Sequence, residues 1–213
     1  MKTKNVFFPC GKLKLEGFCY YPDGKGKFPA VVLCHPHPVY GGSMDNNVIL
    51  ALASALVKKS IIAFMFNFRG VGRSQGSFGG GIDEQDDVAA ALSWLVAQRE
   101  ADTGRIGLAG YSFGALVALP QACRDPRIRA VALISPAIME QGAIAQLKNC
   151  TIPKLIISGD ADKSISSEQL RLMNQEAAEP KRLELISGAD HFWLSQEISL
   201  ADKVVTFFSA VFM

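Results

Sequence analysis

The sequence predicts an α/β fold in which a mostly parallel central sheet is covered by helices on both faces. Short, continuous apolar runs, typical of strands buried on both faces, recur through the chain. Amphipathic segments long enough for helices lie between these runs. Because strand and helix alternate through the body of the chain, we expect right-handed crossovers that build a parallel sheet.

The length and composition indicate one globular domain. No linker or low-complexity run divides the 213 residues, of which 49% are hydrophobic, so we expect a single domain over residues 1–213. The net charge is +2 and the Lys and Arg residues are scattered, so we expect no nucleic-acid partner. No apolar run is long enough for a secretory signal or a membrane span, and the five cysteines lack paired spacing. We therefore expect a cytoplasmic protein with buried free thiols and no membrane partner, while its oligomeric state stays open.

The first part of the chain predicts a hairpin followed by two buried strands. Residues 5–21 alternate in polarity around a turn at Gly11–Lys12, which predicts an N-terminal antiparallel hairpin at a sheet edge. Residues 30–34 and 61–66 are continuous apolar runs and are expected to be covered on both faces. Between them, residues 46–59 carry the apolar stripe of a helix.

The second part of the chain continues the alternation. A long irregular loop over residues 67–81 precedes an amphipathic helix over 83–99, which has acidic residues in its first turns. Pro120 is expected to end or kink the helix that contains it. The connection between residues 134 and 154 is too short for a lid domain. The remaining expected elements are strands at 106–109, 129–134, 154–158 and 182–186 and helices beginning at 115 and spanning 168–178 and 200–211.

A G-x-S-x-G motif lies where a strand is expected to turn into a helix. The motif is Gly110–Tyr111–Ser112–Phe113–Gly114, and its glycines would allow a sharp turn that holds the serine hydroxyl exposed. The same pattern recurs around Ser74, but no strand ends there and the glycine-rich run that follows cannot open a helix. The context therefore predicts Ser112, and not Ser74, as a nucleophile.

A serine nucleophile needs a base and a group that orients the base. His191 lies between the last expected strand and the closing helix, at the sheet edge where ligands gather, so we interpret it as the general base. Asp160 and Asp162 both follow the strand at 154–158, and Asp190 adjoins the histidine. We favour Asp162 as the orienting carboxylate, with Asp160 as the alternative that turn geometry would decide.

Two further patterns are weighed as ligand sites and set aside. His35 and His37 form an H-x-H pair that could bind a metal, but no third ligand stands nearby, and His35 is better read as stiffening its turn. Gly70–Val71–Gly72 begins like a dinucleotide motif, but Gln75 replaces the third glycine and no helix follows. We therefore expect no metal and no cofactor.

These motifs together resemble those of small α/β-hydrolases without a lid, of the serine-esterase type. The similarity is to dienelactone-hydrolase-like enzymes and to small bacterial hydrolases with a His-Pro-His-Pro turn, and it spans essentially the whole chain. Ser112, Asp162 and His191 follow one another in the chain order of that superfamily. Two positions depart from the pattern: Ser112 stands where dienelactone hydrolases proper have cysteine, and Asn67 stands where many members have aspartate. The motifs are 34–38 with 41–46, 67–74, 110–114, 159–162 and 189–192.

The resemblance implies an α/β-hydrolase fold and a carboxylesterase-type serine hydrolase. Ser112, His191 and Asp162 would form the catalytic triad, acting on small or short-chain esters through an acyl-enzyme. The oxyanion hole would use the backbone N–H of Phe113 and that of His37, with Val39 or Tyr40 as alternatives to His37.

Other activities and the substrate pocket follow from the same assignment. A thioesterase or acyltransferase could use the same triad, and a catalytically silent binding module is the alternative from another class. The expected partner is a small-molecule ester or thioester. The candidate pocket residues are Tyr40, Met44, Phe78, Met139, Phe192 and Trp193.

Overall fold

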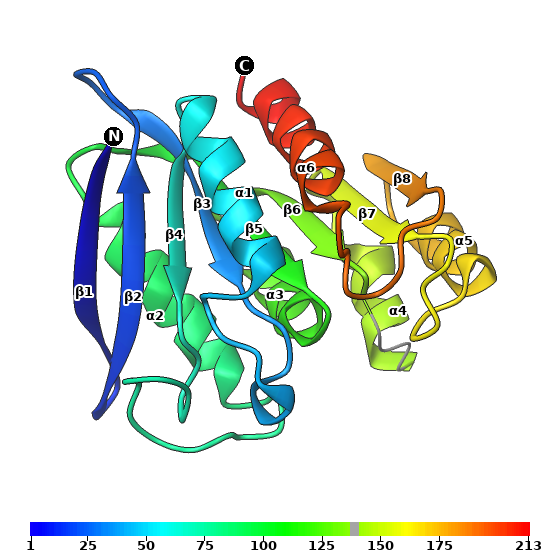
Figure 1. Ribbon diagram of the computed structural model, residues 1–213, viewed down its shortest axis with the longest axis horizontal. Helices are drawn as coiled ribbons and strands as arrows, with labels where there is room; N and C mark the ends of the chain where they lie inside the picture. Colours follow the sequence, from blue (N-terminus) through cyan, green and yellow to red (C-terminus); the bar gives the residue numbers. More distant parts are fainter. Residues whose placement is uncertain (137–140) are drawn as a thin grey trace.

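The computed structural model describes residues 1–136 and 141–213, which form one eight-stranded sheet flanked by helices (Figure 1). The strands are β1 (Lys2–Cys10), β2 (Leu13–Tyr21), β3 (Phe28–Cys34), β4 (Ile62–Phe66), β5 (Ala101–Tyr111), β6 (Ile128–Ile134), β7 (Lys154–Gly159) and β8 (Lys181–Ile186). Their order across the sheet is β1-β2-β4-β3-β5-β6-β7-β8. This confirms the predicted α/β-hydrolase fold.

The antiparallel part of the sheet is confined to its N-terminal edge. Strands β1 and β2 form a hairpin around Gly11 and Lys12, and β2 runs antiparallel to β4. Every other neighbouring pair, from β4–β3 to β7–β8, is parallel. Strands β3, β4 and β7 are buried almost throughout, which explains their continuous apolar sequences.

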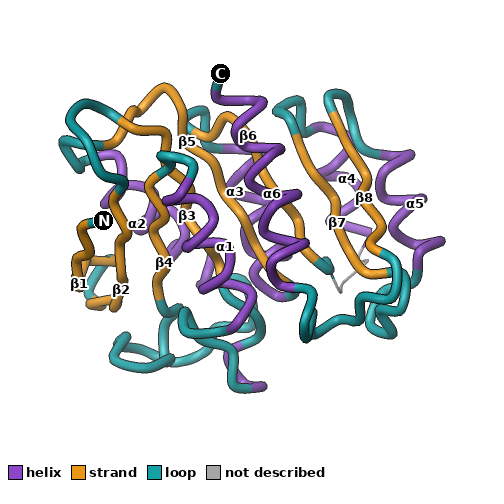
Figure 2. Tube along the Cα trace, turned by 45° about the horizontal axis from the view of Figure 1, so that its top comes forward, coloured by secondary structure: helices purple, strands orange, loops and turns teal. Residues whose placement is uncertain are grey.

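Helices cover both faces of the sheet (Figures 1 and 2). Helices α1 (Asn47–Lys58) and α6 (Glu197–Phe212) pack on one face. Helices α2 (Glu84–Val96), α3 (Phe113–Arg124), α4 (Gln141–Asn149) and α5 (Ser167–Glu176) pack on the other. Within the described ranges, none of these helices combines the length and apolarity needed to cross a lipid bilayer.

Three smaller points of comparison with the sequence concern the cysteines, helix α4 and Pro120. All five cysteines are free thiols, and all but Cys123 are buried, as expected. Helix α4 was not expected from the sequence, because its apolar stripe is short; of its described side chains, Ala143 and Leu147 are buried. Of the two outcomes expected at Pro120, the end of the helix does not occur: α3 continues to Arg124, since its sides are buried against neighbouring elements and this packing outweighs one missing backbone hydrogen bond.

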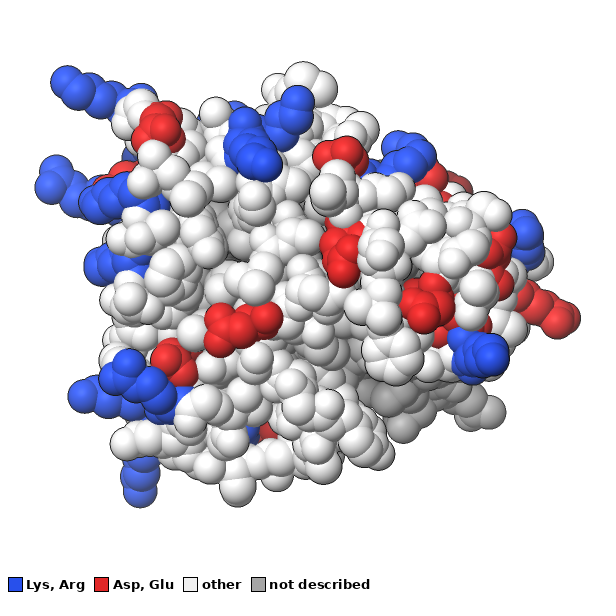
Figure 3. All heavy atoms as spheres, in the orientation of Figure 1, with Lys and Arg blue, Asp and Glu red and all other residues white. Residues whose placement is uncertain are grey.

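The carboxyl ends of the parallel strands meet at one edge of the sheet. The loops that follow β3, β4, β7 and β8 gather at this edge, which lies at the bottom of Figure 2. On the face shown in Figure 3, Lys and Arg side chains concentrate over the β1–β2 hairpin, while the lower edge carries few charges. This arrangement places polar loop residues from several strands close together beside a largely uncharged surface.

A buried ion pair between Arg69 and Asp87 holds the irregular loop over residues 67–81 against α2. Asp87 is fully buried, and its carboxylate accepts hydrogen bonds from the Arg69 backbone N–H at 2.9 Å and from Nη2 at 2.7 Å. A buried carboxylate without its partner is costly, so the pair fixes where the loop leaves β4.

We predict that Asp87→Ala lowers the free energy of unfolding by about 3 kcal/mol, because it leaves the Arg69 guanidinium without its buried partner. Urea denaturation followed by circular dichroism measures the change. The exposed neighbour provides the control: Asp86→Ala should change stability by less than about 0.5 kcal/mol. Equal effects of the two substitutions would contradict this account.

Candidate active site

Ser112 lies on a strained turn between the central strand β5 and helix α3. Its φ is +54° and its ψ is −116°, a conformation that residues with a side chain rarely adopt. Its backbone N–H donates to the carbonyl of Ile134 on β6 at 2.8 Å. A Cβ atom at Gly110 would collide with the Gly114 carbonyl, and one at Gly114 would collide with the carbonyl of Cys34 on β3. Both glycines of the motif are therefore needed for the close approach of three backbone segments.

Three side chains from the ends of β5, β7 and β8 form a continuous series of hydrogen bonds. Ser112 Oγ lies 3.1 Å from His191 Nε2, and His191 Nδ1 lies 2.9 Å from Asp162 Oδ2. With the proton on Nδ1, the ring donates to the carboxylate and accepts from the serine hydroxyl. The imidazole is thus positioned to take a proton from Ser112.

Asp162 is held as an ionised group in a buried place. Its other oxygen, Oδ1, accepts from the backbone N–H of Ser164 at 2.8 Å and of Ile165 at 3.3 Å. Burial by itself raises the pKa of Asp162, but the hydrogen bonds from His191 and from the Ser164 N–H are the main causes that outweigh it, and the net pKa lies below the usual value. The carboxylate can therefore stabilise positive charge on the imidazole.

The two alternative carboxylates have other partners. Asp160 Oδ1 accepts from the backbone N–H of Gly188 at 2.7 Å. Asp190 Oδ1 accepts from the backbone N–H groups of Phe192 and Trp193, both at 2.9 Å. In the hydrogen bonds of the described residues, Asp162 is the only one of these three carboxylates that pairs with the His191 ring, so the turn geometry that the sequence left open places Asp162 at the imidazole.

The loop that carries His191 is fixed at two points. The Tyr111 hydroxyl donates to the His191 carbonyl at 2.6 Å, and the Ala161 N–H donates to the Ala189 carbonyl at 3.0 Å. A Cβ atom at Gly159 would collide with that same Ala189 carbonyl, so glycine lets the β7 and β8 loops touch. Tyr111 was not singled out from the sequence, although it occupies the variable position just before Ser112.

Two backbone N–H groups beside Ser112 are free to bind developing negative charge. Among the hydrogen bonds of the described residues, neither the N–H of His37 nor that of Phe113 is used. The N–H of Val39 donates to His37 Nδ1, and the N–H of Tyr40 donates to the His37 carbonyl. Of the donors considered in this turn, His37 is therefore the one still available.

His35 and Ser74, the other polar residues weighed from the sequence, are built into loops. His35 is fully buried, its Nδ1 donates to the Pro36 carbonyl at 2.6 Å, and its Nε2 accepts from the Phe68 N–H at 3.1 Å. Burial lowers the pKa of His35 to about 4, and both ring nitrogens are engaged, which leaves neither for a metal. Ser74 donates to the carbonyl of Asn67 at 2.7 Å and accepts from the Glu16 N–H at 2.9 Å.

A cleft of about 470 Å³ opens over the Ser112 hydroxyl. Of the side chains expected to line a pocket, Tyr40 and Phe192 do so and are 85% and 64% exposed. The described residues that line the cleft are Pro36, His37, Tyr40, Gly41, Gly42, Asn46, Tyr111, Ser112, Phe113, Ser164, His191 and Phe192. Ser164 carried no sequence signal of a site, and Asn46 was noted only as the last residue of the 41–46 motif and not as a pocket residue.

The other expected pocket residues lie elsewhere. Met44 and Trp193 are buried and are not among the residues lining the cleft. Phe78 lies behind the cleft, with its ring 5.0 Å from that of His37 and 5.6 Å from that of Phe113. Met139 falls outside the described residues.

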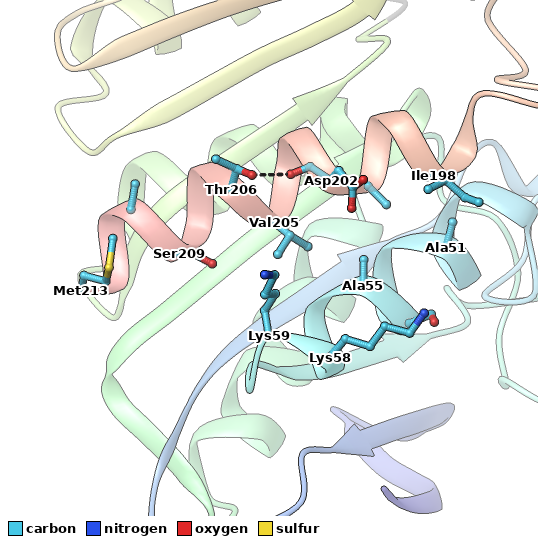
Figure 4. A pocket seen from close by; sticks show the side chains of 13 residues that line it. Ala51, Ala55, Lys58, Lys59, Ile198, Asp202, Val205, Thr206, Ser209 and Met213 are labelled. Atoms are coloured by element: carbon cyan, nitrogen blue, oxygen red, sulfur yellow. Dashed lines mark hydrogen bonds between the residues drawn. The ribbon is translucent and has the colours of Figure 1, made fainter.

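A larger groove, of about 900 Å³, runs between α1 and α6 (Figure 4). Small side chains such as Ala51 and Ala55 line it, together with Lys58 and Lys59. The only hydrogen bond among its drawn residues, from the Thr206 hydroxyl to the Asp202 carbonyl, lies within α6. No histidine or cysteine lines this groove, so the smaller cleft at Ser112 is the candidate active site.

Comparison with known proteins shows the family and the fold to which the chain is similar. Residues 12–203 match the family described as X-Pro dipeptidyl-peptidase (S15 family). An uncharacterized protein of Rickettsia prowazekii is 35% identical over 212 residues, which cover 94% of this chain and 88% of that protein. A thiohydrolase of Arthrinium phaeospermum is 33% identical over 140 residues, which cover 64% of this chain but only 44% of that protein.

Two solved bacterial structures share the fold over nearly the whole chain. An α/β serine hydrolase homologue from Coxiella burnetii has a TM-score of 0.87 at 32% identity, covering 97% of each chain. A structure from Xanthomonas campestris, described as an α/β serine hydrolase without a lid, has a TM-score of 0.84 at 29% identity. It covers 99% of this chain and 95% of that one.

We predict that Gly114→Ala lowers the free energy of unfolding by more than about 2 kcal/mol, because the added methyl group collides with backbone that cannot turn aside. Thermal and urea denaturation measure the loss. Gly142→Ala, on α4, is the matched control, since its Cβ would meet nothing within 4 Å and alanine favours the helix. Unchanged stability of the Gly114 variant would show that the turn is looser than described.

Proposed function

Because this chain belongs to the X-Pro dipeptidyl-peptidase (S15) family and has the α/β-hydrolase fold, we propose that it is a serine hydrolase that cleaves carboxylic esters through Ser112. The observation that carries the proposal is the hydrogen-bonded series from Ser112 through His191 to Asp162. It joins an exposed hydroxyl, a base and an orienting carboxylate, the requirements for nucleophilic catalysis by serine.

The proposed reaction proceeds through an acyl-enzyme. Ser112 Oγ attacks the acyl carbon while His191 Nε2 takes its proton, and Asp162 stabilises the resulting imidazolium. The N–H groups of His37 and Phe113 bind the negative oxygen of the tetrahedral intermediate. His191 then protonates the leaving alcohol, and water attacks the acyl-enzyme in the same manner to release the acid. These steps require no metal or cofactor.

An uncharged ester fits the cleft better than a dipeptide with a free amino terminus. No Asp, Glu, Lys or Arg is among the described residues that line the cleft. The nearby carboxylate of Glu84 is buried and accepts from the backbone N–H groups of Gly79 and Gly81, both at 2.7 Å. Among the described residues of the cleft, a substrate ammonium group would therefore find no anionic partner, which argues for esterase and against dipeptidyl-peptidase activity.

The openness of the cleft supports small or short-chain acyl groups. The two exposed aromatic rings at its sides, Tyr40 and Phe192, offer apolar contact but do not enclose a long chain. A relative of the same fold is described as lacking a lid. We propose a small-molecule substrate and no nucleic-acid or membrane partner. The five free thiols suit a reducing compartment, the cytoplasm.

Ser112→Ala should lower kcat/KM for p-nitrophenyl butyrate by at least about 10⁴-fold, because no other group can form the acyl-enzyme. In the parent protein, a fluorophosphonate should add its mass to the peptide that contains Ser112. Ser74→Ala, which also removes a buried serine hydroxyl, should retain activity within about twofold.

Three results would count against the assignment. Esterase activity that survives in Ser112→Ala would refute the nucleophile. Activity confined to a Gly-Pro-p-nitroanilide substrate would favour a peptidase. A parent protein that neither hydrolyses these substrates nor takes up the fluorophosphonate would favour a binding module.

Thioester hydrolysis or acyl transfer is the second candidate, favoured by the similarity to a thiohydrolase. Both would pass through the same acyl-enzyme, which differs only in what leaves and what attacks. Matched butyryl oxoesters and thioesters, assayed with and without methanol, separate the activities. Faster thioester cleavage would indicate a thioesterase. Methyl butyrate formed in excess over butyric acid would indicate a transferase, whereas oxoester preference with water as acceptor supports the main proposal.

A further inference from the structure

A series of buried hydrogen-bonding groups leads from the His191 loop to the carboxylate of Asp162. The indole Nε1 of Trp193 donates to Ser135 Oγ at 3.1 Å, and Ser135 Oγ lies 3.0 Å from Ser158 Oγ. Ser158 Oγ in turn donates to Asp162 Oδ2 at 3.0 Å. Trp193, Ser135 and Ser158 are each 0% exposed, so these bonds are shielded from water.

The direction of this series is fixed by its two ends. An indole N–H can only donate, and an ionised carboxylate can only accept. Since the single proton of Ser158 goes to Asp162, Ser158 must accept from Ser135, and Ser135 must accept from Trp193. Every hydrogen bond therefore points toward the same carboxylate oxygen, Oδ2, that receives His191 Nδ1.

The backbone of the first two residues of the series, Trp193 and Ser135, is held in an unfavourable conformation. Ser135 has a φ of +42° and Trp193 a φ of +61°, values that residues with a side chain seldom adopt. Such conformations persist where surrounding contacts determine them. Ser135 is further fixed by its N–H, which donates to the Ile157 carbonyl on β7 at 2.8 Å.

The series connects the loop that carries His191 back to Asp162, the carboxylate that is bonded to the His191 ring. Trp193 stands two residues after His191 and ties that loop to Ser135 at the end of β6, while Ser158 belongs to β7, just ahead of the Asp162 turn. With Ser158 and His191 on Oδ2 and two backbone N–H groups on Oδ1, all four donors restrict the carboxylate to one orientation.

We propose that Ser158, oriented by Ser135 and Trp193, is a positioning residue that holds Asp162 with Oδ2 toward His191 Nδ1. This inference rests on the proposed function, in which Asp162 stabilises the imidazolium. Ser158 does not touch the substrate and acts only through Asp162.

Ser158→Ala should lower kcat about 10-fold and leave KM within about twofold, because the lost hydrogen bond supports the transition state and not substrate binding. Without the Ser158 donor the carboxylate becomes more basic, so the His191–Asp162 pair releases its proton less readily. The acid limb of the kcat/KM profile should therefore move to higher pH. Trp193→Phe, which keeps an apolar ring but removes the N–H, should change both quantities in the same direction and by less.

Ser74→Ala is the matched control, since it removes a buried hydroxyl that has no contact with Asp162. It should lower stability without moving the acid limb. If Ser158→Ala leaves kcat and the acid limb unchanged, or if Ser74→Ala moves the acid limb equally, the positioning role is refuted.

A readout that needs no turnover separates this inference from the proposed function. The His191 Nδ1–H signal in proton NMR, assigned by its loss in His191→Gln, should shift in Ser158→Ala and in Trp193→Phe but not in Ser74→Ala. A signal that shifts in this way in a protein that cleaves no ester would sustain the positioning role while the esterase proposal fails. A signal that stays in place in Ser158→Ala would overturn the inference.

Discussion

The architecture of the site depends on the backbone of Ser112, which is held at a positive φ by close packing of three chain segments. Such a conformation costs about 1–3 kcal/mol, and it persists because a hydrogen bond to Ile134 and the contacts of Gly110 and Gly114 leave no alternative path. The strain lifts the serine out of the regular strand and leaves the N–H of Phe113 unused. One local constraint therefore supplies both the candidate nucleophile and a candidate donor for the oxyanion.

The parallel sheet provides the remaining groups by the same geometric rule. Parallel strands have their carboxyl ends at one edge of the sheet. Ser112, Asp162 and His191 follow β5, β7 and β8, so all three residues lie at this edge. Direct contact between the Asp162 and His191 loops, permitted by Gly159, brings the last two groups to hydrogen-bond distance. The sheet thus brings together three side chains that are far apart in the sequence.

Much of this could be predicted from the sequence, because the relevant signals are local. The strand-turn-helix context of Gly110–Gly114 identified Ser112 as the candidate nucleophile. The order of strands placed Asp162 and His191 at the same edge of the sheet as Ser112. The choice between Asp160 and Asp162 could not be made in advance, since both follow β7 and only the turn decides which side chain reaches the imidazole.

Residues whose roles depend on contacts between distant elements could not be identified from the sequence. Trp193 was a candidate pocket residue from the sequence, yet it has a positive φ and its side chain is buried in the core. Ser135 and Ser158 are ordinary residues at strand ends, and their hydroxyl groups acquire a role only when β6 and β7 pair. Helix α4 escaped notice because its stability comes from packing on α3 and not from a long apolar stripe.

The central claim is that Ser112 acts as a nucleophile beneath a preformed oxyanion hole, and a crystal structure of the protein after reaction with a phosphonate ester tests it most directly. The account predicts a covalent bond from phosphorus to Ser112 Oγ, with the phosphonyl oxygen about 2.7–3.1 Å from the backbone nitrogens of both His37 and Phe113. Phosphorus bound to another residue, or a phosphonyl oxygen that points away from both nitrogens, would contradict it.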